Sequence, residues 1–239
     1  MSTARTATRR SRGSGRLQLT LLALGVLLLG ALLVDRIFFD SSSTPAGTGS
    51  GVAAKQARSL APFTGVALAG ANNVVVRVGA RQSVVVHADS NLLSRVTTRV
   101  RAGRLVIGNT PGNLNAKTRM FVVVTVPSLD RLSVRGAGNI SVTGIASRAL
   151  TVSLPGAGNV EASGRTTTLD VTIGGEGTAL LHQLVARDAN AALSGDGTIM
   201  LTATRRLTAK LSGSGTILYG GAPAHVTQSI TGSGTISPG

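Results

Sequence analysis

Two acidic residues occupy equivalent places in neighbouring copies of a short glycine phrase, Gly175-Glu176-Gly177 and Gly195-Asp196-Gly197. If the copies stack one rung apart as parallel strands, the two carboxyl groups lie about 5 Å from each other. Retaining glycosidases hold their two carboxylates at such a separation. However, no His, Tyr or Arg recurs beside the pair to tune a pKa, and exposed turn residues would look the same. We therefore expect no catalytic residues, and a glycan-active β-helix enzyme using Glu176 and Asp196 stays as the alternative.

Metal binding is a second chemistry that these residues could support. The two carboxylates and the hydroxyls of Thr178 and Thr198 could supply part of the six to eight oxygens that calcium requires. The repeat is twice as long as that of calcium-binding nonapeptide rolls, and Thr178 stands where a ligating aspartate would be needed. The three histidines, at positions 87, 182 and 225, show no ligand spacing. The sequence thus predicts no metal and no cofactor.

Arginines supply the best candidate for an interaction surface. In the run 95–101, alternation places Arg95, Arg99 and Arg101 on one side of a strand, and Arg104 follows just beyond. Guanidinium groups suit phosphate and carboxylate, so these four could bind a polyanion. The whole chain has 24 basic and 9 acidic residues, a net charge of +15, which also favours anionic partners. A strand kept soluble by its charges would have the same sequence.

A glycine phrase recurs six times and points to the architecture. Successive first glycines are 20, 19, 20, 18 and 19 residues apart, a period typical of a solenoid. The residue after each second glycine is Asn or Thr, which predicts a ladder along one corner. The turn glycines are Gly136, Gly138, Gly156, Gly158, Gly175, Gly177, Gly195, Gly197, Gly213, Gly215, Gly232 and Gly234, and the ladder is Asn139, Asn159, Thr178, Thr198, Thr216 and Thr235.

The residues before each phrase alternate between apolar and polar, as in Leu150, Val152 and Leu154 before Gly156. This period of two indicates strands with one buried face, and no segment beyond residue 60 has a sustained helical period. We expect an all-β parallel β-helix over residues 62–239, with coils of about 19 residues and about nine turns. Glycine in these turns can take a positive φ and lets neighbouring backbones approach closely. With no Cys, no Trp and four Phe, the core must be aliphatic.

The N-terminal region predicts export. Residues 1–16 form a basic tail, and the apolar segment 17–34 is just long enough to cross a bilayer as a transmembrane anchor or uncleaved signal. The positive-inside rule keeps the tail cytoplasmic and places the remainder in the periplasm or outside the cell. Residues 35–61, rich in Ser, Gly and Thr, are expected to be a flexible linker. This topology argues against nucleic acid as a partner.

Val124-Thr-Val-Pro-Ser-Leu129, followed by the serial Gly-x-Gly phrases, resembles the head GIN domain family of bacterial auto-transporter adhesins. The resemblance covers roughly residues 62–236 and implies an exported, right-handed parallel β-helix without catalytic residues. The chain departs from the family pattern at Asn72, which replaces the second glycine of a phrase that begins at Gly70. The expected function is a non-enzymatic, membrane-anchored interaction or adhesin-like module. Its expected partners are the membrane, through residues 17–34, and an anionic envelope polymer or a surface protein, with self-association through open solenoid ends.

Overall fold

The computed structural model describes residues 47–239. The predicted cytoplasmic tail, the predicted membrane segment and the first part of the predicted linker lie outside the described residues. Within them, no helix is long and apolar enough to span a membrane. The described chain is all-β, and its one helical element is the 3-10 helix η1 (Leu93–Arg95).

Short strands come first along the chain, four long strands follow, and three short strands come last. They are β1 (Gly47–Thr48), β2 (Ala53–Ala57), β3 (Gly65–Leu68), β4 (Asn73–Val78), β5 (Ser83–Asp89), β6 (Val96–Arg101), β7 (Arg104–Asn109), β8 (Leu114–Asn115), β9 (Phe121–Val126), β10 (Arg131–Val134), β11 (Asn139–Leu154), β12 (Asn159–Ile173), β13 (Thr178–Leu193), β14 (Thr198–Leu211), β15 (Thr216–Gly220), β16 (His225–Ile230) and β17 (Thr235–Pro238).

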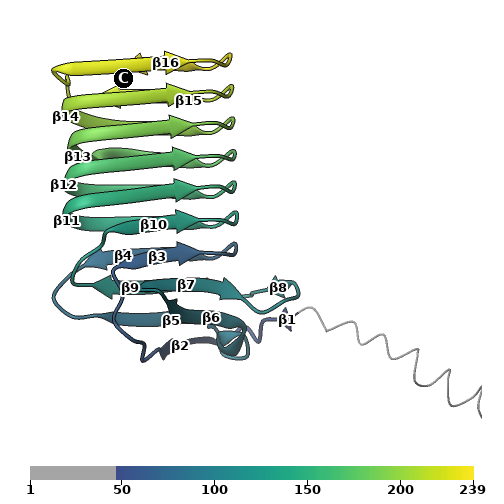
Figure 1. Cartoon of the computed structure of the whole chain (residues 1–239). Coiled ribbons are helices and arrows are strands. Elements are labelled where there is room, and N and C mark those ends of the chain that lie inside the picture. Colours follow the sequence, from purple (N-terminus) through teal and green to yellow (C-terminus); the bar gives the residue numbers. More distant parts are fainter. Residues whose placement is uncertain (1–46) are drawn as a thin grey trace, which may run out of the picture. The chain divides into compact units, whose positions relative to one another are not determined.

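The strands from β10 onward form the predicted solenoid. Each long strand pairs in parallel with the next on both sides of a mid-strand register shift, so that successive coils stack with their turns aligned along one edge (Figure 1). We call the row of strand segments that precede the glycine turns the pre-turn face: β6, β7, β3, β10, the C-terminal halves of β11 to β14, and β16. The post-turn face holds β2, β5, β9, β4, the N-terminal halves of β11 to β14, β15 and β17.

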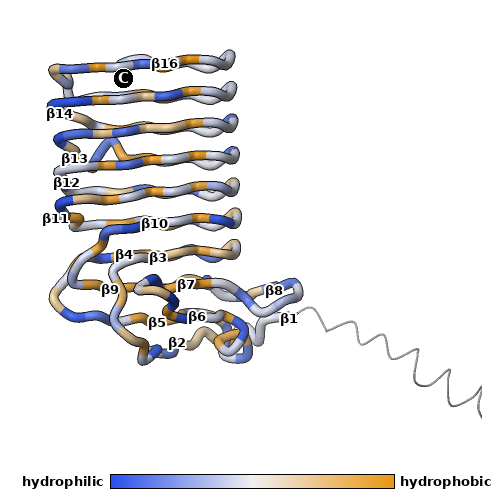
Figure 2. Tube along the Cα trace, in the orientation of Figure 1, coloured by the Kyte–Doolittle hydropathy of each residue, from blue (hydrophilic) through white to orange (hydrophobic). Residues whose placement is uncertain are grey.

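The core lies between these two faces and is aliphatic, as predicted. Inward residues such as Leu150, Val152 and Leu154 have no exposed surface. The parallel register places them in columns, for example Leu132, Val152 and Val171 on consecutive rungs. Figure 2 shows hydrophobic positions alternating with polar ones along each rung. Burial of these columns is the main stabilising contribution to the stack.

The glycine turns pack backbone against backbone. A Cβ on Gly175 would lie 2.3 Å from the carbonyl oxygen of Gly156 in the preceding turn, closer than any side chain tolerates. None of the twelve predicted turn glycines uses the positive φ that glycine can adopt. Glycine is needed here because the turns approach one another closely, and not because the backbone is left-handed.

The N-terminal third does not follow the serial order of nine coils that we expected. The β3–β4 coil lies between the β7–β9 rung and the β10–β11 rung, because β3 pairs with both β7 and β10 and β4 with both β9 and β11. Below them, β5 runs antiparallel to β9 and to β2, and β6 runs antiparallel to β7. Antiparallel strands therefore close this end of the stack, a feature that a search for periodic phrases cannot detect.

This order also explains why Asn72 is tolerated where a glycine was expected. In the β7–β9 rung, a long loop follows Asn109 at the place where the later rungs have a glycine turn. No glycine turn therefore stacks against Asn72 from that side. The buried Asn72 amide donates a hydrogen bond to the side-chain oxygen of Asn109 at 2.9 Å. The side chain thus joins two rungs where glycine would leave a gap.

Part of the predicted linker is folded. Strand β1 pairs in parallel with β8, and β2 adds to the edge of β5, so residues 47–57 belong to the β-structure and not to a tether. The buried carboxylate of Asp89 holds this segment, accepting hydrogen bonds from the amides of Gly51 (2.6 Å), Lys117 (3.0 Å) and Thr118 (3.1 Å). Burial alone would raise the pKa of Asp89, but hydrogen bonds from Thr118, Gly51 and Lys117 outweigh it and lower the pKa below its ordinary value.

Gly175→Ala is expected to lower the free energy of unfolding by about 1–3 kcal/mol or more, because the new methyl group meets a backbone carbonyl that cannot move away alone. The matched control is Gly174→Ala in the same turn, where the nearest atom to a Cβ is the Ser194 hydroxyl at 3.8 Å. The control should be neutral or slightly stabilising, by about 0.4–1 kcal/mol. Chemical denaturation of the full-length chain in mild detergent measures both, and equal effects would contradict the stacking argument.

Asp89→Asn is expected to release the segment 47–58 at neutral pH, because an amide can accept only part of the hydrogen bonds that the carboxylate accepts. Since the pKa of Asp89 is lower in the folded chain, its contribution to stability is complete above the ordinary aspartate pKa of about 3.9 and is lost as the pH falls through the folded value. Hydrogen exchange of the 47–58 backbone at pH 7, with the exposed Asp130→Asn as control, measures the release. The thermal midpoint of the unmodified chain between pH 7 and pH 3 measures the titration. Unchanged exchange in Asp89→Asn would refute this role.

Candidate functional site: an arginine-lined pocket

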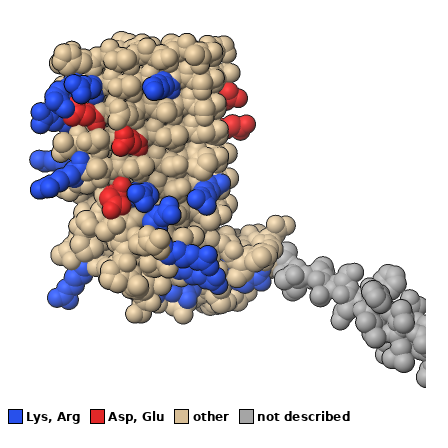
Figure 3. Space-filling model, viewed as in Figure 1, with Lys and Arg blue, Asp and Glu red and all other residues tan. Residues whose placement is uncertain are grey.

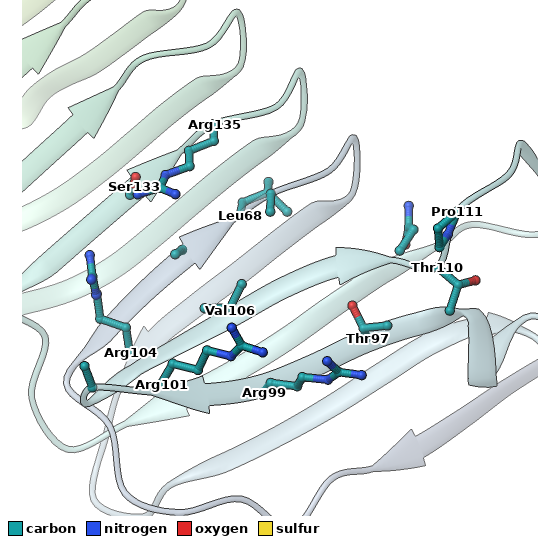
Figure 4. A pocket seen from close by; sticks show the side chains of 14 residues that line it. Leu68, Thr97, Arg99, Arg101, Arg104, Val106, Thr110, Pro111, Ser133 and Arg135 are labelled. Atoms are coloured by element: carbon teal, nitrogen blue, oxygen red, sulfur yellow. The ribbon is translucent and has the colours of Figure 1, made fainter.

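A pocket of about 540 Å³ opens on the pre-turn face near the closed end of the stack. Four arginines line it: Arg99 and Arg101 from β6, Arg104 from β7, and Arg135 just after β10. Figure 4 shows Arg99 and Arg101 extending side by side from β6, while Arg135 enters from the other side. No acidic residue lines the pocket. Three of the four predicted polyanion-binding residues are therefore brought together.

The backbone of the hairpin formed by β6 and β7 brings two of these charged side chains, Arg101 and Arg104, close together. Strands β6 and β7 form a hairpin whose two turn residues, Ala102 and Gly103, have φ values of 48° and 69°. Such a two-residue turn, with positive φ at both positions, sets Arg101 directly opposite Arg104. Like charges that face each other across an antiparallel pair destabilise it. Alanine at positive φ adds strain, and backbone strain of this kind clusters at functional sites.

The hollow exists because the residues between the arginines are small. The outward positions of one register column are Arg99, Val106, Ala67 and Ser133, so short side chains form the floor on three consecutive rungs. In the neighbouring column, Gly65 lies between Arg104 and Arg131, and a Cβ there would lie 2.7 Å from the Cγ atom of Arg104. Glycine at this position lets the Arg104 side chain lie against the sheet.

The guanidinium groups of the four pocket arginines have no hydrogen-bond or ion-pair partner among residues 47–239. By contrast, Arg205 forms a two-point contact with Asp188 elsewhere in the solenoid. The hydrogen bond from Arg205 lowers the pKa of Asp188, and the same bond raises the pKa of Arg205. The pocket therefore gathers positive charge that the described protein does not neutralise, which is the electrostatic condition for binding an anion.

Arg95 has a different role from its three predicted companions. Its guanidinium donates to the Thr110 hydroxyl (2.6 Å) and to the Pro111 carbonyl (2.9 Å). Thr110 and Pro111 line the pocket, so Arg95 fixes one wall of the pocket and is occupied by protein atoms. Arg135 takes its place as the fourth cation. Sequence reasoning missed Arg135 because it lies far along the chain from Arg99 and reaches the pocket only through the order of the rungs.

The other sequence-predicted residues lie away from this pocket. Glu176 and Asp196 are exposed at the tips of successive glycine turns. His182 and His225 are exposed, and the ring of His87 stacks on Phe121 with 4.4 Å between centroids. Within residues 47–239, no group of three or more His, Asp or Glu side chains is arranged to hold a metal ion.

The predicted ladder runs along the post-turn face, in register on every rung. Its lower part is hydrogen-bonded through side chains, since Asn139 donates to Asn73 and Asn159 donates to Asn139, both at 2.8 Å. Asn73 was not predicted as a member, although the phrase that begins at Gly70 places it at the equivalent position. From Thr178 upward, the threonines align in register on consecutive rungs. These contacts join rungs and do not form a pocket.

Comparison with known proteins identifies relatives by family and by fold. A family model described as "Putative auto-transporter adhesin, head GIN domain" matches residues 62–223, more than half of the chain. No curated protein matches the sequence significantly. A "putative adhesin" from Bacteroides fragilis has a similar structure, with a TM-score of 0.67, 21% identity, and coverage of 80% of this chain and 99% of that one.

Two structures from Parabacteroides distasonis are also similar. One is called a "putative adhesin" (TM-score 0.53, 20% identity, 81% of this chain and 99% of that one). The other is called a "Putative lipid binding protein" (TM-score 0.52, 20% identity, 80% and 98%). At these identities the likeness establishes the shared fold.

Proposed function

Because the chain belongs to the head GIN domain family of "putative auto-transporter adhesins", we propose that it is a non-enzymatic, adhesin-like binding module of the cell surface. Its ligand in this proposal is an anionic polymer of the cell envelope, bound in the arginine pocket. The observation that carries the proposal is the set of four arginines, Arg99, Arg101, Arg104 and Arg135, around a hollow without acidic residues. Guanidinium groups bind carboxylate and phosphate through paired hydrogen bonds.

The location in this proposal follows from the sequence before the described domain. Residues 17–34 anchor the chain in the membrane with the basic tail in the cytoplasm, and the solenoid lies in the periplasm or outside the cell. We also propose that the coils of the solenoid are right-handed. We further propose that the chain self-associates through its last rung. Every residue of β16 is exposed, and Val226 and Ile230 present apolar side chains there.

A non-enzymatic role is favoured because the Glu176 and Asp196 carboxylates stand at exposed turn tips, each between two glycines. General acid–base catalysis requires neighbouring groups that shift a pKa and hold a substrate in place. Glycine neighbours offer neither, so no observation favours the glycan-active enzyme over the binding module.

The double substitution Arg99→Ala and Arg101→Ala is expected to weaken binding of the full-length chain to isolated bacterial envelope fractions by about tenfold or more, because each charge-assisted hydrogen bond is worth roughly 1.5–3 kcal/mol. Binding of the unmodified chain should fade as salt rises, because ions screen exposed charges. Co-sedimentation across a salt series in mild detergent measures both effects.

The matched control is Arg148→Ala with Arg187→Ala, which removes the same charge from exposed positions outside the pocket. If the control pair weakens binding as much as the pocket pair, net charge and not the pocket is responsible. If neither pair has an effect, the arginine pocket is not the binding site.

A further inference from the structure

We propose that the pre-turn face binds a polysaccharide strand laid along the solenoid axis, with an acidic sugar in the arginine pocket and neutral sugars on the rungs above it. This inference rests on the proposed function and names its ligand class. The strand would be one in which acidic and neutral sugars alternate, in contrast to a polymer that carries a charge on every unit.

A second hollow on the same face supplies the first argument. It has a volume of about 260 Å³ and lies over β12, β13 and β14. Its polar lining consists of Asp170 and Thr172 on one rung, Asn190 on the next, and Thr208 and Lys210 on the third. We call this the upper hollow.

The arginine pocket and the upper hollow are connected by one rung of small hydroxyl side chains. The floor column of the pocket continues from Ser133 to Ser153 and then to Thr172, and Thr151 lies beside it in the neighbouring column. No long side chain projects from this rung at either of these outward positions. A linear ligand can therefore pass from the pocket to the upper hollow without leaving the sheet surface.

The side of the upper hollow that lies nearer the arginine pocket carries a negative charge, that of Asp170, which is unfavourable for a continuous polyanion. The Asp170 carboxylate accepts one hydrogen bond from the Asn190 amide at 2.8 Å, and its other oxygen Oδ2 receives no hydrogen bond from a described residue. Two negative charges close together near a protein surface repel each other by several kcal/mol at most and by much less when salt screens them, but the sign is unfavourable. A carboxylate beside an amide and two threonine hydroxyls is instead well suited to hydrogen-bond sugar hydroxyls, which both donate and accept.

The positions of the charges fix the pattern of the ligand. Positive side chains lie over β6, β7, β3 and β10 on the lower part of this face, and on the upper rungs they lie mainly along the edge opposite the glycine turns (Figure 3). Lys210 on β14 returns one positive charge four rungs above β10, a distance of about 19 Å along the axis. Asp170 lies between these two positive regions, on β12, two rungs above β10 and two rungs below β14. Along the two columns that the ligand would follow, the side chains are positive at the arginine pocket, neutral to negative at Thr151 and Asp170, and positive again at Lys210. This order matches acidic sugars separated by neutral ones.

The test measures affinity of the full-length chain in mild detergent for hyaluronan oligosaccharides, in which an acidic sugar alternates with a neutral one. The disaccharide, tetrasaccharide and octasaccharide are compared with oligogalacturonates of the same lengths, in which every sugar is acidic. We expect affinity for hyaluronan to rise with length and to exceed that for oligogalacturonate at the octasaccharide.

The decisive variant is Asp170→Ala, with Asp196→Ala as a control that makes the same change of charge at an exposed turn tip. We expect Asp170→Ala to weaken binding of the hyaluronan octasaccharide about tenfold, through loss of a hydrogen bond to a charged group, and Asp196→Ala to leave it unchanged. Stronger binding by Asp170→Ala would mean that Asp170 only repels the ligand, and no change would mean that the ligand does not reach the upper hollow. Either result overturns the inference.

These failures can be told apart from a failure of the proposed function. If Arg99→Ala with Arg101→Ala still abolishes binding of oligogalacturonate while hyaluronan shows no length dependence, the arginine pocket stands and the inference falls. If the arginine variant binds every oligosaccharide as well as the unmodified chain, the proposed function itself is wrong.

Discussion

The close packing of one glycine turn on the next is the constraint on which the rest of this solenoid depends. Carbonyl oxygens of one turn occupy the space where side chains of the next would begin, so the two backbones must meet at a fixed place on every rung. The repeat interval nevertheless varies between 18 and 20 residues. The structure absorbs this variation far from the turns, where the register shifts between Val142 and Ile145 on β11 and between Leu181 and Val185 on β13. The strands that flank the turns therefore stay in register throughout.

Because the register is fixed, the outward side chains of each face form a regular grid of rungs and columns. Side chains that alternate outward along a rung recur about 4.8 Å higher on the next rung, so each column of the grid can be read as a sequence of its own. On the pre-turn face these columns bring Arg99, Ala67 and Ser133 together, although they lie far apart in the chain. The candidate site is thus a property of the stacking order, and any slip of a rung would dismantle it.

Most of the repetitive part of the fold could be predicted from the sequence, because a local signal specifies it. The period of two fixes which side chains face the core, as at Leu150 and Val152, and the spacing of the glycines fixes which residues share a column. The N-terminal order could not be predicted in this way. Inserting β3 and β4 between rungs formed later in the chain is a matter of long-range pairing, and no local pattern encodes it. Arg135 was missed for this reason, and Asp89 was missed because its partners are backbone amides, which carry no sequence signal.

The same geometry is the reason to place the proposed binding site on a strand face and not on the turn edge. The middle residue of each glycine phrase, such as Glu176 or Asp196, stands alone between two residues without side chains. Any ligand there would be touched by one side chain per rung and by solvent on both flanks. On the pre-turn face, each outward side chain has neighbours along its own rung and on the rungs above and below. The residue types in a column therefore decide whether a charge lies beside an opposite charge, beside a like charge or beside neutral groups. In the arginine pocket, two like charges are neighbours, because Arg101 lies opposite Arg104 and no acidic residue lines the pocket. This arrangement is electrostatically unfavourable. An anionic ligand is the simplest partner that would relieve that repulsion.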